Sequence, residues 1–196
     1  MKAANKKHMS TEKMVLGAIL TALVVVLQLA GSFVRFGPFA ISLVLAPIVI
    51  GAATCGTAIS TWLGFVFSVV VMMTDAAGFL AISVPGTVIT VMLKGTLCGL
   101  VAGIAYNLLK SKNKFLAVFA AAVVCPIVNT GIFVLGCFAF FFDALTAAGI
   151  SEGFSGAVEY IFIGMIGLNF IVEFATNLVL SPVIVRLLDL RKDHKK

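Results

Sequence analysis

The sequence predicts an all-α integral membrane protein with six transmembrane helices and with both termini in the cytoplasm. Hydrophobic residues make up 61% of the chain and charged residues 11%, whereas about a quarter of the residues of soluble domains are charged. Twelve of the 14 Lys and Arg residues lie in three short segments, at 2–13, 110–114 and 186–196. Because Lys and Arg of short loops are retained in the cytoplasm, we predict that these segments face it.

The length fits this topology, because 196 residues suffice for about six spans of roughly 20 residues each. We expect the first helix at residues 13–31, followed by an outer segment at 32–39 that contains Arg35. The charge-free stretch at 36–74 is too long for one span. It predicts a helical hairpin with a break near residues 51–56, which supplies the second and third helices.

The second half of the chain predicts three further helices, which run over residues 86–109, 115–142 and 158–188. Outer loops are expected at 75–85 and 143–157, and the basic turn at 110–114 is expected inside. The whole is one membrane domain at residues 13–188 with basic tails at 1–12 and 189–196. The acidic residues of the outer segments are Asp75, Asp143, Glu152 and Glu159.

Several classes of protein are excluded by what the sequence lacks. The basic clusters adjoin apolar stretches without interleaved aromatic residues, which favours contact with anionic lipid over binding of nucleic acid. No GxxxxGK[ST] motif of a nucleotide-binding loop occurs. The histidines, His8 and His194, lie in the tails, and the four cysteines form no CxxC pair. The sequence therefore predicts no metal site and no cofactor, and it predicts that the chain is not an enzyme.

Three strongly polar residues are predicted to lie near the middle of the last three helices, namely Lys94, Asn129 and Glu173. A charged side chain at that depth costs at least about 2.5–3.5 kcal/mol. These side chains are therefore expected to face the interior of the bundle. They form a substrate site or, in the alternative, Lys94 and Glu173 form a salt bridge that fixes helix packing without any ligand.

Two polar stripes favour the substrate site. Asn169 and Asn177 flank Glu173 at spacings of four residues, and Thr87 and Thr90 precede Lys94 at spacings of three and four. Such spacings place side chains on one face of a helix. Thr and Asn in membrane helices also form hydrogen bonds to neighbouring helices. Thr87 and Thr90 therefore either bind substrate or pair with a neighbouring helix.

Small residues four positions apart allow a second helix to approach closely. Ala18 and Ala22 form such a pattern in the first helix, and Gly95, Gly99 and Gly103 form one in the fourth. Ala18, Ala22, Gly95 and Gly99 are predicted to contact a partner protein, with packing inside the chain as the alternative for the glycines.

Taken together, these features resemble the substrate-binding S-components of energy-coupling factor (ECF) vitamin transporters. The resemblance covers residues 14–188 and depends on the basic amino terminus, the AxxxA pattern, the six spans, the run FGPFAISL at 36–43 and the run PIVIGA at 47–52. It implies partners: a transmembrane coupling protein, which Ala18 and Ala22 would contact, and two ABC-type ATPases. It also implies that the outer segments around Arg35 and 75–85 cover a pocket supplied by helices four to six.

By this resemblance the chain is the substrate-binding subunit of an importer for a vitamin or vitamin precursor in the plasma membrane of a prokaryote. Lys94 with Asn129 and Asn169 favours a pantothenate-like anion. Glu173 keeps open a pyrimidine or pteridine precursor, whose ring NH groups it would bind. Two other functions stay open: a stand-alone carrier driven by protons through Glu173, and a bundle that assembles or regulates other membrane proteins.

Overall fold

The computed structural model describes residues 11–33, 35–36, 39–40 and 43–193. The chain begins with α1 (Thr11–Phe33) and a short antiparallel hairpin of β1 (Arg35–Phe36) and β2 (Phe39–Ala40). The helices that follow are α2 (Leu45–Thr54), α3 (Thr57–Thr74), α4 (Ala77–Ile82), α5 (Val84–Leu109), α6 (Lys114–Gly136), the π-helix η1 (Cys137–Phe141), α7 (Phe142–Ser151), α8 (Ala157–Glu159), the π-helix η2 (Tyr160–Gly167) and α9 (Leu168–Asp193).

Within the described residues, five helical segments are long and apolar enough to cross a membrane. They comprise Thr11–Ser32, Thr57–Thr74, Val84–Leu109, Lys114–Ser151 and Ala157–Arg186. The prediction of six transmembrane helices is therefore not confirmed, because the second predicted span has no helix of that length among the described residues. There the chain forms the β-hairpin and then α2, whose 10 residues extend about 15 Å, half the thickness of the hydrocarbon core.

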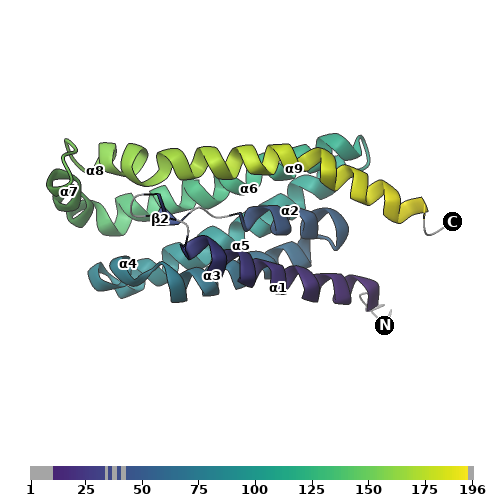
Figure 1. Cartoon of the computed structure of the whole chain (residues 1–196), viewed down its shortest axis with the longest axis horizontal. Coiled ribbons are helices and arrows are strands. Elements are labelled where there is room, and N and C mark those ends of the chain that lie inside the picture. The colour runs from purple at the N-terminus through teal and green to yellow at the C-terminus, as the bar shows by residue number, and fades with distance from the viewer. Residues whose placement is uncertain (1–10, 34, 37–38, 41–42, 194–196) are drawn as a thin grey trace, which may run out of the picture.

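The short helix α2 is tolerated because protein surrounds it. It packs against α1, α3, α5, α6 and α9, and Figure 1 shows it between the long helices. Eight of its residues are buried, with Ile48 and Val49 fully inaccessible. Backbone that is not helical is accepted at membrane depth only where protein or a cavity covers it.

The break between the predicted second and third helices lies where the sequence predicts it, between α2 and α3. α2 ends at Thr54 and α3 begins at Thr57, and Gly56 between them has a φ of +102°. L-residues with a side chain rarely adopt this backbone conformation. The glycine therefore allows the tight reversal that joins the two helices.

The predicted outer loops are largely helical, which corrects the expectation for both. Residues 75–85 contain α4, and residues 143–157 contain most of α7. The last two of the five long helical segments also include π-helical turns, at η1 and η2. Such turns are rare and often occur at functional sites.

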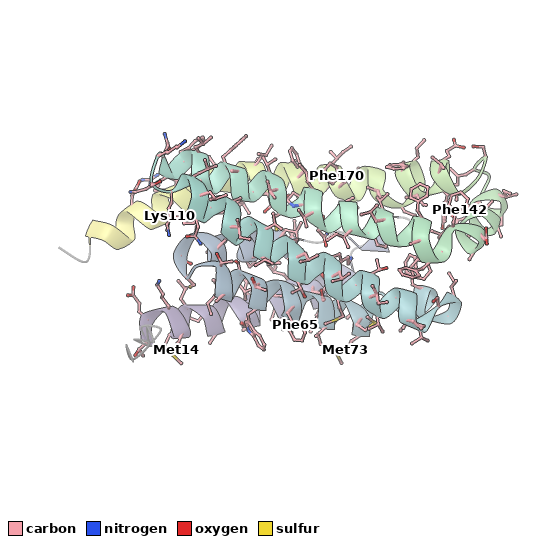
Figure 2. The ribbon with its side chains drawn as sticks, turned by 180° about the vertical axis from the view of Figure 1, so that it is seen from behind. Met14, Phe65, Met73, Lys110, Phe142 and Phe170 are labelled. Carbon is pink, nitrogen blue, oxygen red and sulfur yellow. The ribbon has the colours of Figure 1, made fainter. Side chains whose placement is uncertain are left out.

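Both ends of the described chain and the α5–α6 connection lie at the same end of the bundle (Figure 1). The labels Met14 and Lys110 mark this basic end in Figure 2, and Phe142 marks the opposite end. That opposite end also holds the acidic residues Asp143 of α7, Glu152 immediately after α7, and Glu159 of α8. The arrangement agrees with the charge pattern, and the cytoplasmic position of the basic end stays a prediction.

The glycine stripe of α5 packs inside the chain. A Cβ atom added to Gly95 would lie 2.2 Å from Ser68 Oγ and 2.6 Å from the Gly64 carbonyl oxygen, and one added to Gly99 would lie 2.1 Å from the Ser60 carbonyl oxygen. The prediction that Gly95 and Gly99 contact a partner is therefore wrong. They let α5 approach the backbone of α3, which is the alternative that the sequence left open.

Candidate functional site

A cavity of about 90 Å³ lies among the helices of the bundle, and its lining includes Gln28 near the end of α1 and Asp75 just after the end of α3. By the volume that one water occupies in such a cavity, it has room for roughly six to nine water-sized groups. Residues from α1, α3, α4, α5, α6, η2 and α9 line it: Gln28, Phe67, Val71, Asp75, Ala76, Phe79, Val91, Lys94, Asn129, Thr130, Phe133, Met165, Ile166, Asn169, Phe170 and Glu173.

The polar centre of the cavity is a group of three residues from α6 and α9. Glu173 is only 2% exposed and Asn129 only 6%. The carboxamides of Asn129 and Asn169 lie beside the Glu173 carboxyl group. The Oδ1 atoms of both asparagines are buried without a hydrogen-bond partner.

Lys94 approaches the same cavity from α5. Its Nζ atom lies 5.6 Å from the ring centroid of Phe67 and 5.3 Å from that of Phe133, within the range of a cation–π interaction. Lys94 also interacts electrostatically with Glu173. The structure describes both residues, and it shows no ion-pair contact between them. The alternative of a packing salt bridge between Lys94 and Glu173 is therefore not what the structure contains.

A second polar group, which the sequence analysis did not assign to the site, closes the outer part of the cavity. Gln28 of α1 is 3% exposed, and its Nε2 atom donates a 2.8 Å hydrogen bond to Asp75 Oδ2. The Thr74 hydroxyl donates a 2.7 Å bond to the same oxygen. The sequence could have indicated Gln28 as a site residue, since it is the only carboxamide in the apolar stretch 14–34. Asp75 was predicted only as a residue of the outer loop.

Phenylalanine side chains form much of the apolar wall. Phe67, Phe79, Phe133 and Phe170 all line the cavity. Phe79 makes edge-to-face contacts with Phe133 at 5.6 Å and with Phe141 at 5.0 Å between ring centroids. Phe79 belongs to α4, and Ala76, which precedes that helix, also lines the cavity. The segment at 75–85 therefore covers the cavity at its outer end.

Comparison with known families decides the class of protein. Residues 12–185 match the family model described as "ECF transporter, substrate-specific component". The chain belongs to this family. No curated protein and no solved structure matched the sequence. Family membership makes the chain a multi-pass membrane subunit that binds substrate for an ECF transporter and works with the components of the ECF module.

Four of the residues predicted to bind substrate line the cavity of this S-component, namely Lys94, Asn129, Asn169 and Glu173. Three others do not. Thr87 is buried and donates to the Ser83 carbonyl oxygen, and Thr90 packs against Gly136 of α6. Asn177 donates to the Glu173 carbonyl oxygen, one turn beyond the cavity.

Thr87, Thr90 and Asn177 were predicted to line the site, but they lie at the ends of the two polar stripes, outside the cavity lining. The side chains at four-residue spacing do share a face of the helix, but the cavity spans only part of that face. Thr87, Thr90 and Asn177 meet the packed helices on either side of it. Arg35 belongs to β1, and its side chain lies outside the described part of the structure.

The predicted partner residues Ala18 and Ala22 lie on the outer surface of the S-component, where both are exposed. Their neighbours on α1 include Val15 and Ile19, which are 55% and 59% exposed. Figure 2 shows the apolar edge that α1 and α3 share, with Met14, Phe65 and Met73 along it. Within the described residues, nothing covers this alanine face, defined here as Ala18, Ala22 and the exposed side chains beside them on α1.

Proposed function

We propose that the chain captures a small vitamin or vitamin precursor in the cavity between α3, α5, α6 and α9 and delivers it for import across the plasma membrane of a prokaryote. The alanine face of α1 contacts the transmembrane coupling protein. Two ABC-type ATPases of the same module supply the energy, since the sequence holds no nucleotide-binding loop. The basic end of the bundle faces the cytoplasm.

One observation carries this proposal: four polar side chains from three helices meet at a cavity deep in an otherwise apolar bundle. An ammonium or a carboxylate at membrane depth is costly, and such residues mark substrate pathways in transport proteins. The buried Oδ1 atoms of Asn129 and Asn169 have no partner in the protein, although buried polar atoms are normally paired.

The choice of substrate depends on which polar residue dominates. Lys94 taken alone favours a carboxylate, as in the pantothenate-like anion predicted from the sequence. Glu173 shares the cavity with Lys94 and would repel that carboxylate at short range. The class of substrate therefore depends on the hydrogen-bonding character of the whole lining.

Transport by the complete complex tests the proposed function. The compound retained by the purified chain is identified by mass spectrometry and then offered, in labelled form, to proteoliposomes that contain the chain with or without the ECF module. We expect saturable uptake that requires the module and internal ATP. A protonophore should leave that uptake unchanged.

Two results would contradict the proposal. Full uptake by the chain alone, abolished by a protonophore, would show a proton-driven carrier. A chain that retains no compound and shows no saturable uptake with the module would instead be a membrane protein of assembly or regulation.

A further inference from the structure

The cover of the cavity, defined as residues 75–85, has little packing of its own. Within it, Ala76 alone is buried, and none of the six residues of α4 is. Figure 1 shows α4 at the end of the bundle opposite the two ends of the described chain. A segment with few buried apolar contacts opens more readily than the core of a protein. The position of the cover must therefore depend on contacts with other helices.

Gln28 of α1 holds the beginning of the cover. Its Nε2 atom donates a 2.8 Å hydrogen bond to Oδ2 of Asp75, and Gln28 is only 3% exposed. Asp75 directly follows the last residue of α3, and it lies 47 residues from Gln28 in the sequence. A hydrogen bond to a carboxylate is stronger than one between neutral groups, and burial strengthens it further. The bond therefore fixes the cover to a helix that is not part of it.

A second contact holds the middle of the cover to a different wall of the cavity. Phe79 makes edge-to-face contacts with Phe133 of α6 and with Phe141 of η1. Aromatic pairs accept several relative arrangements of their rings, whereas a hydrogen bond fixes the position of one atom. Of these two contacts, the one from Gln28 is therefore the more directional.

We propose that Gln28 is a positioning residue of the substrate site. Through Asp75 it holds the cover closed over the cavity and slows the exchange of the cavity's contents with the surrounding water. The inference rests on the proposed function in taking this cavity as the substrate site. Loss of the Gln28 donor should make the cavity open more often, while the rest of the bundle stays closed.

A cysteine placed in the cavity measures how often the cover opens, with no need for the substrate. Val91→Cys puts a thiol on α5, at a residue that is 6% exposed and lines the cavity. The chain is held in lipid nanodiscs and treated with 2-sulfonatoethyl methanethiosulfonate, a charged thiol reagent that stays in water. Mass spectrometry gives the rate of modification at residue 91 and at the four native cysteines. These are buried and do not line the cavity, so they report opening of the whole bundle.

The donor is tested by Gln28→Met, which removes the carboxamide and keeps the length of the side chain. We expect modification at residue 91 to become about ten- to a hundredfold faster, the range for loss of a hydrogen bond to a charged group. The rates at the native cysteines should not change. The matched control is Thr74→Val, which removes another donor to Asp75 Oδ2. Thr74 precedes Asp75 in the chain, so its bond ties the cover to no other helix, and the rate should stay as it was.

An exchange of donor and acceptor separates the hydrogen bond from the shape of the two side chains. Gln28→Glu alone sets two carboxylates against each other and should speed modification at residue 91. Adding Asp75→Asn supplies the donor from the other side, because a carboxamide donates and a carboxylate accepts. The rate should then return close to that of the unaltered pair. A merely structural role for Gln28 predicts no such recovery.

Unchanged modification at residue 91 in Gln28→Met, or an equal acceleration by Thr74→Val, would overturn the inference. A rise at residue 91 that is matched at the native cysteines would do the same, because the whole bundle would then have loosened. So would a reporter that reacts, with Gln28 in place, as fast as the exposed Ser151→Cys, since the cavity would then not be covered.

Should Gln28→Met fail to fold, Gln28→Glu with and without Asp75→Asn decides the matter. None of these measurements needs the substrate or the ECF module. Failure of uptake with the module would therefore remove the proposed function and leave the labelling rates as measured, whereas a negative labelling result leaves the proposed function standing.

Discussion

The chain contains two helix faces built from small residues at four-residue spacing, and it uses them in opposite ways. On α5, Gly95 and Gly99 lie against the backbone of α3, so close that a Cβ atom would collide with main-chain oxygens. On α1, Ala18 and Ala22 are exposed. The first face joins two helices of the same subunit, whereas the second is open for another protein.

The difference shows that the spacing alone specifies close approach and not the identity of the partner. α5 finds its partner within the chain because α3 has its own small residues opposite, Gly64 and Ser68. α1 packs on α3 and α2 with its other side, where Leu20 and Val24 are buried. The alanines are left on the outer side. Substitutions on the two faces should therefore affect different properties, the stability of the subunit or its coupling to transport.

The largest effect on stability is expected for Gly99→Leu. A Cβ atom at residue 99 would meet the Ser60 carbonyl oxygen at 2.1 Å, and a carbonyl of the helix backbone cannot rotate away. Overpacking of a buried site typically costs 1–3 kcal/mol, and here we expect about 3 kcal/mol. The measurement is unfolding of the purified protein by titration of a denaturing detergent, together with the yield of monodisperse protein.

Gly131→Leu is the matched control for this substitution. Gly131 lies in α6 and is exposed, and nothing is within 4 Å of a Cβ added there. Because glycine is a poor helix former, leucine at this position should leave stability unchanged or raise it by a few tenths of a kcal/mol. Equal losses at residues 99 and 131 would show that the α3–α5 interface is not the tight contact described here.

A smaller effect is expected for Ser68→Ala at the same interface. The Ser68 hydroxyl donates a 2.7 Å hydrogen bond to the Val91 carbonyl oxygen across the two helices. Interhelical bonds of this kind contribute about 0.6 kcal/mol on average and at most about 1.7 kcal/mol. We expect a loss of about 1 kcal/mol in the same unfolding titration.

Ser151→Ala serves as the control for Ser68→Ala. The Ser151 hydroxyl is exposed and bonds only to the Ala148 carbonyl oxygen within α7, so its removal should be neutral within error. A neutral Ser68→Ala would mean that glycine packing alone holds α3 to α5.

Sequence predictions that depend on local patterns agree with the structure, whereas those that depend on which segments pack together agree less well. The long apolar segments, the break at Gly56 and the polar residues Lys94, Asn129 and Glu173 all depend on local patterns, and the structure contains them. The second predicted span is not confirmed, because a run of apolar residues does not show whether lipid or protein surrounds it. α2, which lies in that stretch, is enclosed by five helices.

The same reasoning explains the errors at the site. Periodicity placed Thr87, Thr90 and Asn177 on the correct faces, but it cannot show where along a helix a cavity ends. Gln28 and Asp75 are 47 residues apart in the sequence, and their hydrogen bond forms only because α1 packs beside the end of α3. No pattern within either segment contains that contact. The glycine stripe was likewise ambiguous until α3 was known to lie against it.

The smallest effect on stability, and the clearest effect on function, is expected for the double substitution Ala18→Leu, Ala22→Leu. Both positions are exposed, so added side chains meet no neighbour in the subunit and stability should change by less than about 0.5 kcal/mol. The cavity is lined from α1 by Gln28 alone among the described residues, so ligand affinity should be unchanged. ATP-driven uptake should fall to background, because the coupling helix can no longer approach α1 closely.

The control for the alanine face is Ala175→Leu, which adds the same bulk to an exposed position on α9 and should transport normally. Loss of ligand binding in the double variant would show that α1 shapes the cavity, and normal uptake would show that the module docks elsewhere. Loss of uptake with binding retained would separate the two small-residue faces fully. The glycines would then hold the subunit together, and the alanines would connect it to the source of energy.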